Sequence, residues 1–504
     1  MKKRMNTLRR VLTGALFLAL LLGALAGVSR VVERKASRTR FEPFLSEPEE
    51  FDVLFIGDSL VVNGVFPMEL WQDYGIAAYN LASYGNTLPV TYWTLMNALE
   101  AASPRLVVVG VKDVEKDYKL SGSSSDVHTA LDCYPLTLTK ICAVNDLMDD
   151  PYAVDDSGVR YADMKLEYLF TLGKYHSRWS ELSTSDFGGY TLNRQKGAET
   201  GTGVAAARDY DLIDEEQAAE GGGWGYEYLR RILDVCADRG IEVLLVHMPY
   251  IASEEEQMAA NAVRYIAEEY GVGYIDFVSQ DDTVDYAVDC MDARAHLNAS
   301  GAKKVTDYLG RYITEHYDVE DRRGQPGWLG WDEDMAVYMR DKDDLLRSQS
   351  SLESELMLLS DDDYSACILV RDAQTLCGSD QLRTLMHNIV REHVYEEDMF
   401  SKWSNAIFTL ERLEAAGAQP YALVADRSVG SFSELVGDEL GGGTALPSGE
   451  LTLNADAEGV CATLIQGNGQ ESAAQGADVA VLVLRASTGE LVAAKGFALA
   501  EKEE

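Results

Sequence analysis

The stretch Phe51-Asp-Val-Leu-Phe-Ile-Gly-Asp-Ser-Leu60 decides the fold. Val53 to Ile56 is a short apolar run of strand-forming residues, so it predicts a buried strand. Gly57-Asp58-Ser59 follows at once, at the end of the strand where ligands bind on an open α/β sheet. The glycine lets the backbone approach a substrate closely. The stretch predicts a strand that presents a reactive serine, although a polar turn without function has the same pattern.

A second stretch far along the chain supplies what such a serine needs. It reads Asp292-Ala-Arg-Ala-His296-Leu-Asn-Ala-Ser-Gly-Ala. A serine becomes a nucleophile when a histidine takes its proton, and a carboxylate orients that histidine. Asp292 is the nearest carboxylate before His296, and Asp289 lies behind it. The two stretches predict Ser59 as nucleophile, His296 as base and Asp292 as orienting acid.

Five short apolar runs alternate with helical patterns, which predicts a parallel sheet in a three-layer α/β/α domain over 51–317. The strand candidates are 53–57, 76–81, 106–109, 243–246 and 274–277. The alternation stops over about 112–220, and we interpret this segment as a cap over the carboxyl ends of the strands. A charged segment marked by Gly and Pro predicts a linker at 318–350. The remainder, 351–504, predicts a β-rich α+β domain, either a binding module or a structural one.

Charge and hydropathy separate the N-terminus from the rest of the chain. Residues 1–40 hold ten Lys and Arg and one Glu, a charge of +9, so the remainder carries −48 against a total of −39. This acidic body argues against binding nucleic acid. Val11 to Val28 is an 18-residue apolar run preceded by basic residues. It predicts a single-pass membrane anchor within 1–29, followed by a linker at 30–50, with the body extracytoplasmic. Cleavage after Ala26 would instead give a secreted protein.

The seven cysteines show no metal-binding spacing, and no glycine-rich phosphate loop is present. We therefore predict no metal and no cofactor.

The quoted motifs resemble those of SGNH (GDSL-like) hydrolases, over roughly residues 50–317. The chain is most similar to the membrane-tethered branch that O-acylates cell-surface polysaccharides, the alginate O-acetyltransferase and D-alanyl-transfer type. Gly57-Asp58-Ser59-Leu60 matches the family's first block, Asn80 to Gly85 its second, and Asp292 to His296 its last. The resemblance implies an acyl-serine enzyme that transfers an acyl group, such as acetyl, to a polysaccharide. It also implies a membrane-bound O-acyltransferase as partner.

Two positions depart from the family pattern. Lys112 stands where an Asn that helps to hold the oxyanion is expected, which leaves Ser59, Gly85 and Asn86 as oxyanion donors, with Lys112 as a charged substitute. The usual Asp-x-x-His spacing is one residue longer here. A carbohydrate esterase or deacetylase of the same fold, and a catalytically degenerate polysaccharide-binding scaffold, are therefore alternatives. The C-terminal half more faintly resembles the interleukin-like EMT inducer domain, through Pro420 to Val424 and Gly476 to Leu484.

Four further residues are candidate substrate contacts. Asp58 directly precedes the serine, and His176, Arg178 and Trp179 lie in the expected cap. A cation beside an aromatic ring suits an anionic or sugar ligand, but such a cluster also pins loops. His247 ends a strand, and we interpret it as a satisfied residue at the edge of the core.

Overall fold

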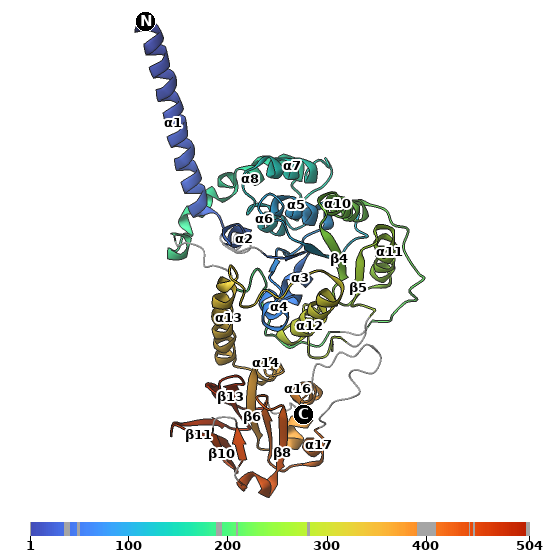
Figure 1. Cartoon of the computed structure of the whole chain (residues 1–504), viewed down its shortest axis with the longest axis vertical. Helices are drawn as coiled ribbons and strands as arrows, with labels where there is room; N and C mark the ends of the chain where they lie inside the picture. Colours follow the sequence, from blue (N-terminus) through green and yellow to red (C-terminus); the bar gives the residue numbers. More distant parts are fainter. Residues whose placement is uncertain are drawn as a thin grey trace.

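The structure is a computed structural model that describes residues 2–34, 41–47, 51–187, 194–207, 210–279, 283–390, 410–442, 444–446 and 449–499. It consists of a long N-terminal helix, an α/β part and a β-rich C-terminal part (Figure 1). The expected linker at 30–50 lies partly outside the described residues.

A five-stranded parallel sheet forms the centre of the α/β part. Its strands are β1 (Val53–Ile56), β2 (Ala78–Asn80), β3 (Leu106–Gly110), β4 (Glu242–His247) and β5 (Gly273–Asp276). They lie in the order β2-β1-β3-β4-β5, and Val53 is in register with both Ala78 and Leu106. The α/β fold with a parallel sheet is thus confirmed. The second strand is three residues shorter than the predicted 76–81, and the bounds of the other four agree with the prediction to within one residue at each end.

Alternate side chains of the strands enter two different cores, so helices cover both faces of the sheet. Leu54 and Val107 pack with α5 and α10, whereas Val53 and Leu106 pack with α3 and α12. Figure 1 shows the sheet between these two helical layers. The helices flanking the strands are α2 (Phe41–Ser46), α3 (Ser59–Gly64), α4 (Pro67–Tyr74), α5 (Leu88–Ala98), α10 (Trp224–Arg239), α11 (Glu254–Tyr270) and α12 (Ala299–His316).

The segment expected to form a cap is helical where the structure describes it. Its elements are α6 (Ser124–Leu131), α7 (Leu138–Leu147), α8 (Tyr161–Leu169), α9 (Leu172–Tyr175), η2 (His176–Ser180) and η3 (Thr184–Phe187). Helix α7 packs against α5, and α8 packs against α7, so these helices extend the layer on one face of the sheet. Residues 194–207 run past the carboxyl ends of the strands instead, where Glu199 N donates to Val62 O and Ala205 N to Cys290 O. The role of 112–220 as a cap stays a prediction.

Helix α1 (Lys2–Val32) projects from the body (Figure 1). Thr7–Val32 contains an 18-residue stretch with a mean hydropathy of 2.4, and none of the residues in that stretch is buried against the rest of the protein. A helix of this length and composition is compatible with a membrane anchor or a signal sequence.

The segment expected to be a linker contains a long helix, α13 (Leu329–Ser348). Trp331, Tyr338 and Leu346 of α13 are buried, and Trp331 stacks on Trp71 with ring centroids 5.3 Å apart. The expected linker is thus in large part a helix packed against the body, with charged residues such as Asp334 and Asp343 buried as well, and this helix joins the two parts of the body.

The C-terminal part contains two antiparallel sheets, in the orders β14-β13-β6-β7-β8 and β12-β11-β10-β9. The predicted β-rich α+β character is confirmed. The strands are β6 (Tyr364–Val370), β7 (Tyr421–Asp426), β8 (Ser431–Val436), β9 (Thr444–Leu446), β10 (Gly449–Ala455), β11 (Val460–Gln466), β12 (Glu471–Gly476), β13 (Val479–Arg485) and β14 (Leu491–Phe497). The helices are α14 (Leu352–Leu358), α15 (Ala373–Cys377), α16 (Asp380–Val390) and α17 (Glu411–Ala415), with a 3₁₀ turn, η4 (Gly437–Gly441).

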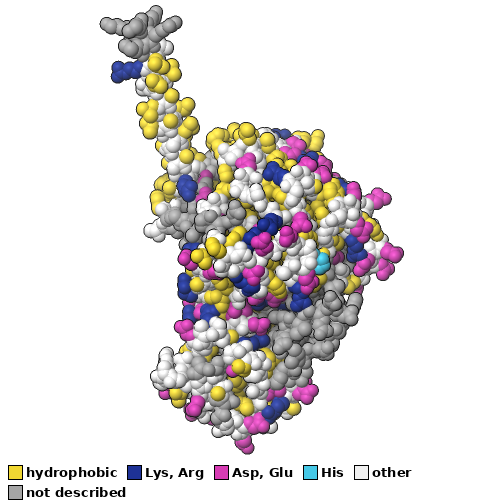
Figure 2. Space-filling view, viewed as in Figure 1, with side chains coloured by type: hydrophobic (Ala, Val, Ile, Leu, Met, Phe, Trp, Pro, Cys, Tyr) yellow, Lys and Arg dark blue, Asp and Glu magenta, His cyan; other side chains and the backbone are white. Residues whose placement is uncertain are grey.

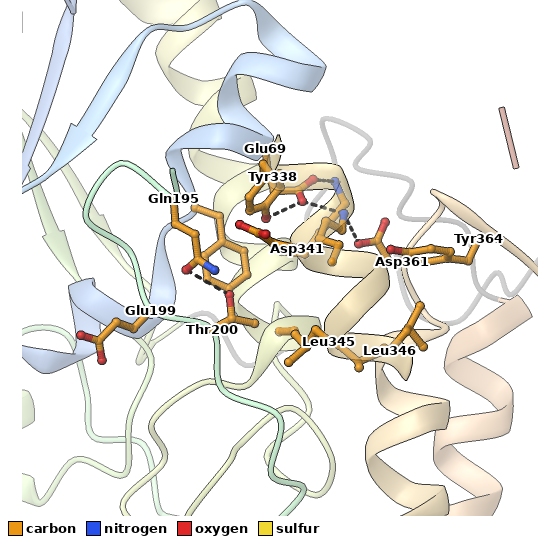
Figure 3. Close-up of a pocket in the computed structure, with 15 residues that line it drawn as sticks. Glu69, Gln195, Glu199, Thr200, Tyr338, Asp341, Leu345, Leu346, Asp361 and Tyr364 are labelled. Carbon is orange, nitrogen blue, oxygen red and sulfur yellow. Dashed lines mark hydrogen bonds and ion pairs between the residues drawn. The ribbon is translucent and has the colours of Figure 1, made fainter. Parts of the chain in front are cut away.

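A cavity of about 330 Å³ lies where the two parts meet (Figure 3). Lys342 Nζ is 2.8 Å from Glu69 Oε1 and 2.6 Å from Asp361 Oδ2, so one lysine links carboxylates of the two parts. Tyr338 also donates to Glu69, at 2.8 Å. These buried charges are mutually paired, which is the condition under which burying them is tolerated.

Candidate functional site

Ser59 lies at the junction of β1 and α3. It is the first residue of α3, and Asp58 caps this helix by accepting a hydrogen bond from Leu60 N at 3.2 Å. Gly57 has φ +152°, and a Cβ there would lie 2.8 Å from Val61 Cγ2 and 3.2 Å from Gly110 Cα. Only glycine suits this position, where the ends of β1 and β3 approach each other. The local backbone thus places the serine at the carboxyl edge of the sheet.

The structure brings His296 to Ser59 across 237 positions of sequence. Ser59 Oγ and His296 Nε2 are 2.9 Å apart. His296 Nδ1 and Asp292 Oδ2 are 2.8 Å apart. Because a carboxylate only accepts, Nδ1 carries the proton and Nε2 is left to accept from the serine hydroxyl. The three side chains form one continuous chain of hydrogen bonds.

The loop before α12 explains how Asp292 reaches His296 despite the longer spacing. Cys290 and Leu297 form an isolated antiparallel bridge, and Ala295 turns with φ +63°. Asp292 Oδ1 accepts from Arg294 N at 2.8 Å and from His296 N at 3.3 Å. The extra residue is thus absorbed in a tight turn, and the backbone itself holds the carboxylate. Asp289 does not take this role: it is fully buried and pairs with Lys304 at 2.6 Å.

Charges around the site differ in sign and burial. Burial opposes the ionised form of Asp292, but the hydrogen bond from His296 and the backbone donors outweigh it, so the pKa of Asp292 is lowered. Asp58 is buried, and burial raises its pKa, although Lys112 acts in the opposite direction. The pKa of the acid beside the nucleophile is thus raised, whereas the pKa of the acid beside the base is lowered.

Lys112 follows β3 and reaches toward Asp58. Its Nζ is 3.7 Å from Asp58 Oδ2 and 5.5 Å from the centre of the Tyr250 ring. Burial disfavours its charge, yet the attraction of Asp58 and then Asp113 outweighs burial and raises the pKa of Lys112. Lys112 thus contacts Asp58, the residue before Ser59, together with Asp113 and Tyr250. Sequence reasoning missed Tyr250, although its place just after β4 marks the same edge of the sheet.

Asn80, which opens the second block, and Asn86, which directly follows it, have different surroundings. Asn80 Nδ2 donates to Val61 O at 2.8 Å and to Val65 O at 3.2 Å, so this amide ties β2 to α3. Asn86 is buried, and within the described residues its Nδ2 has no hydrogen-bond partner. An unpaired buried donor carries an energetic cost of about 1–3 kcal/mol, so it calls for a specific explanation. Gly85, beside it, is exposed and has φ +66°.

The structure places the candidate contacts of the expected cap at the base of α1 rather than beside Ser59. Arg178 Nη1 donates to Val32 O at 2.6 Å and to Glu33 O at 2.8 Å. The last carbonyls of a helix lack intrahelical partners, and the guanidinium supplies them. His176 bonds to Gly173 O, and Trp179 is exposed. These contacts match the alternative stated above, in which the cluster pins a segment of the chain instead of binding a substrate.

Two groups of three carboxylates have the spacing that a cation could use: Glu69 with Asp361 and Asp363, and Asp113 with Glu115 and Glu256. In each group a lysine already pairs with at least one of the carboxylates. Lys342 binds the first group, and Lys116 lies 2.6 Å from Glu115 in the second.

No protein-family model matches the sequence, and no curated protein matches it. Among solved structures, a Bacteroides fragilis NCTC 9343 protein assigned as an acylhydrolase is similar at a TM-score of 0.28 and 11% identity, over 56% of this chain and 98% of that one. An acetyl xylan esterase from the rumen bacterium Butyrivibrio proteoclasticus is similar at a TM-score of 0.22 and 10% identity, over 55% and 64% of the two chains.

Proposed function

We propose that the protein is an acyl-transferring serine enzyme of SGNH type. The observation that supports it is the hydrogen-bonded chain Ser59–His296–Asp292, with contacts of 2.9 Å and 2.8 Å. Nucleophilic catalysis needs serine and base within about 2.6–3.2 Å of each other, and the base needs a third group to orient it. A structural serine at the end of a strand requires neither.

The proposed reaction has two half-steps. Ser59 Oγ attacks the acyl carbonyl of an ester donor while His296 Nε2 takes the hydroxyl proton, and the donor alcohol leaves with that proton. An acceptor hydroxyl then attacks the acyl-serine, gives its proton to His296 and releases Ser59. Asp292 keeps Nδ1 protonated and stabilises the imidazolium that forms in each step.

The developing oxyanion needs donors aimed at it before the reaction begins. Ser59 N is the first amide of α3, and amides in the first turn of a helix have no intrahelical acceptor. Asn86 Nδ2 is a second donor, because it is buried without a partner. We assign the hole to these two groups and to Gly85 N, with Lys112 holding Asp58 behind the serine.

The acceptor in this proposal is a hydroxyl of a cell-surface polysaccharide, and the acyl group is acetyl. The resemblance in the sequence motifs supports both assignments, together with a membrane-bound O-acyltransferase that supplies acyl groups. An anchored α1 would keep the body extracytoplasmic and raise the effective concentration of the serine near such a donor.

Hydrolysis is the second candidate. The side chain of Asp292 is 43% exposed, so water reaches the edge of the site. A water molecule in place of the sugar hydroxyl makes the protein a carbohydrate esterase with the same residues. A binding scaffold without chemistry is the third candidate, and the aligned triad argues against it.

The test is acyl transfer by the purified full chain from an activated acetyl ester to acetyl-free polysaccharide. Wild type is expected to release the alcohol and to acetylate the polysaccharide, and Ser59→Ala to do neither. Ser300→Ala is a matched control, because Ser300 is also buried but its hydroxyl has no partner within the described residues. Alcohol release without acetylated polysaccharide would favour the esterase. Equal activity of Ser59→Ala and wild type would contradict both.

A further inference from the structure

A groove lies between α1 and the body, at the point where α1 leaves it. Its volume is about 1170 Å³. Its apolar lining comprises Leu22 and Leu25 of α1 and Leu136, Leu169, Phe170 and Leu172 of the body. One wall is therefore the most apolar helix of the chain, and the other consists of the residues just before α7, the end of α8 and the start of α9.

The base of α1 is built into the body beside this groove. Ser29 Oγ and Thr171 Oγ1 are 3.0 Å apart, and Arg178 binds the carbonyl of Val32. These contacts fix the direction in which α1 leaves the body. The surface of the body that flanks α1 thus has a defined position relative to any membrane that α1 crosses.

The charged residues of α1 indicate how far into a membrane the groove would lie. Arg10 and Arg30 lie 20 positions apart, which is about 30 Å of helix, the thickness of a bilayer's hydrocarbon core. With these two arginines at the two interfaces, Leu22 and Leu25 lie within the hydrocarbon. Leu136 and Phe170, which line the same groove from the body, then lie toward the outer end of the hydrocarbon.

The outer surface of the body continues this apolar wall. We name it the apolar collar: Leu136, Leu138, Ile141, Leu166 and Phe170, all exposed. Lys165 Nζ, 3.5 Å from Asn145 Oδ1, ties α8 to α7 within this surface. Figure 2 shows hydrophobic side chains along the edge of the body next to α1. Large exposed apolar patches mark sites where something else docks.

We infer that the apolar collar and the groove dock on the outer leaflet of the bilayer that α1 crosses, with lipid acyl chains filling the groove. The collar enters the boundary between headgroups and acyl chains, as amphipathic interfacial elements do. The contact is apolar, which agrees with the acidic body, because it needs no anionic lipid. It orients the body on the membrane and holds it there independently of any catalysis at Ser59.

The test uses the full chain in phosphatidylcholine vesicles. A polarity-sensitive fluorophore is placed at Leu138→Cys, and separately at Leu166→Cys, in a Cys142→Ser background. The matched control is Val429→Cys, because Val429 is 72% exposed where Leu138 is 79% exposed, and it lies between β7 and β8 in the C-terminal part. The unsubstituted Cys142→Ser chain measures labelling of the remaining cysteines.

At both collar positions, nitroxide-labelled lipid is expected to remove most of the fluorescence, and the emission is expected to shift to the blue. The label at position 429 is expected to respond only to aqueous iodide. If the collar labels respond as position 429 does, the inference is wrong. It is equally wrong if the collar labels are protected in native membranes but not in vesicles, because a membrane protein would then cover the collar.

Discussion

Two histidine–aspartate pairs lie at the carboxyl edge of the same sheet, and they differ in what surrounds them. His296 Nδ1 is 2.8 Å from Asp292 and His247 Nδ1 is 2.9 Å from Asp276, so the pairs are almost identical in length. The side chain of His296 is 17% exposed and its other nitrogen meets a serine hydroxyl, whereas His247 is 3% exposed and packs edge-on against Tyr250.

The difference shows that a histidine–carboxylate pair does not define a site by itself. The pKa of both aspartates is lowered, because in each case hydrogen bonding and attraction to histidine outweigh burial. A third pair, His128 with Asp132 at 3.0 Å, is stacked inside the helical layer against Tyr168. What distinguishes His296 is a nucleophile on its second nitrogen together with access to solvent.

The largest effect is expected from Ser59→Ala. Removal of the hydroxyl leaves His296 paired but without a nucleophile, so acyl release should fall by about 10⁴-fold or more. Thermal unfolding followed by circular dichroism should be unchanged, because the serine contributes little to the core. If Ser59→Ala keeps the wild-type rate, the exposed His296–Asp292 pair has no catalytic role that the buried His247–Asp276 pair lacks.

The next test exchanges each carboxylate for an amide. Asp292→Asn should lower the rate by roughly 10²–10⁴-fold, because the amide no longer fixes the His296 tautomer. Asp276→Asn should leave the rate of the folded protein unchanged. Measured rates are normalised to folded protein, and a larger rate loss from Asp276→Asn would reverse the assignment of the two pairs.

A third test concerns the side-chain amide of Asn86, which we assign to the oxyanion hole. Asn86→Ala should lower kcat by about 10²–10³-fold with little change in KM, as expected for a donor that acts on the transition state. It should not destabilise the fold, because no protein partner is lost. If kcat is unchanged and stability rises, Asn86 is only an unsatisfied buried group.

The buried His247–Asp276 pair should affect the stability of the fold, and its effect should depend on pH in the acid range. Because the folded pKa of Asp276 is lowered, its stabilisation is complete above the unfolded value of about 3.9 and is lost as pH falls through the lower folded pKa. Asp276→Asn should cost about 1–3 kcal/mol of unfolding free energy at neutral pH and flatten the loss of stability in acid. Asp292→Asn should change this profile less, because water screens the exposed pair. Urea unfolding as a function of pH measures the stability of both variants. If their pH profiles are equal, the buried pair does not stabilise the fold more than the exposed pair.

The smallest effect is expected from Lys112→Ala. Since Lys112 contacts Asp58 and Tyr250 rather than the serine, the rate should fall by less than about tenfold. A loss of about 10²–10³-fold would instead make Lys112 an oxyanion donor. Lys112→Met, which keeps most of the side-chain volume, controls for lost packing.

Much of the α/β part could be predicted from the sequence, because its strands are short apolar runs buried on both faces. Val53–Ile56 and Leu106–Gly110 are examples, and both are fully buried. The strand at 76–81 is shorter because only Ala78–Asn80 pairs with β1. In the C-terminal part, β8, β9, β11 and β12 were not predicted; β12, for example, buries only Ala474 and gives no apolar run.

The site itself could be predicted only in part. Ser59 and His296 are marked by their motifs, but the turn at Ala295 that brings Asp292 to His296 depends on a positive φ that the sequence does not display. Arg178 could not be placed, because its partners are backbone carbonyls of α1. The pairing of His247 with Asp276 depends on the order of the strands, which places β4 beside β5.

The central claim is that Ser59 is a nucleophile activated by His296, and covalent trapping tests it most directly. The full chain is incubated with a serine-reactive phosphonate, and the adduct is located by peptide mass spectrometry. One adduct on Ser59 is expected in wild type and in His247→Gln, and none in Ser59→Ala or His296→Ala. Wild-type protein without an adduct on Ser59, or His296→Ala labelled as fast as wild type, would contradict the claim.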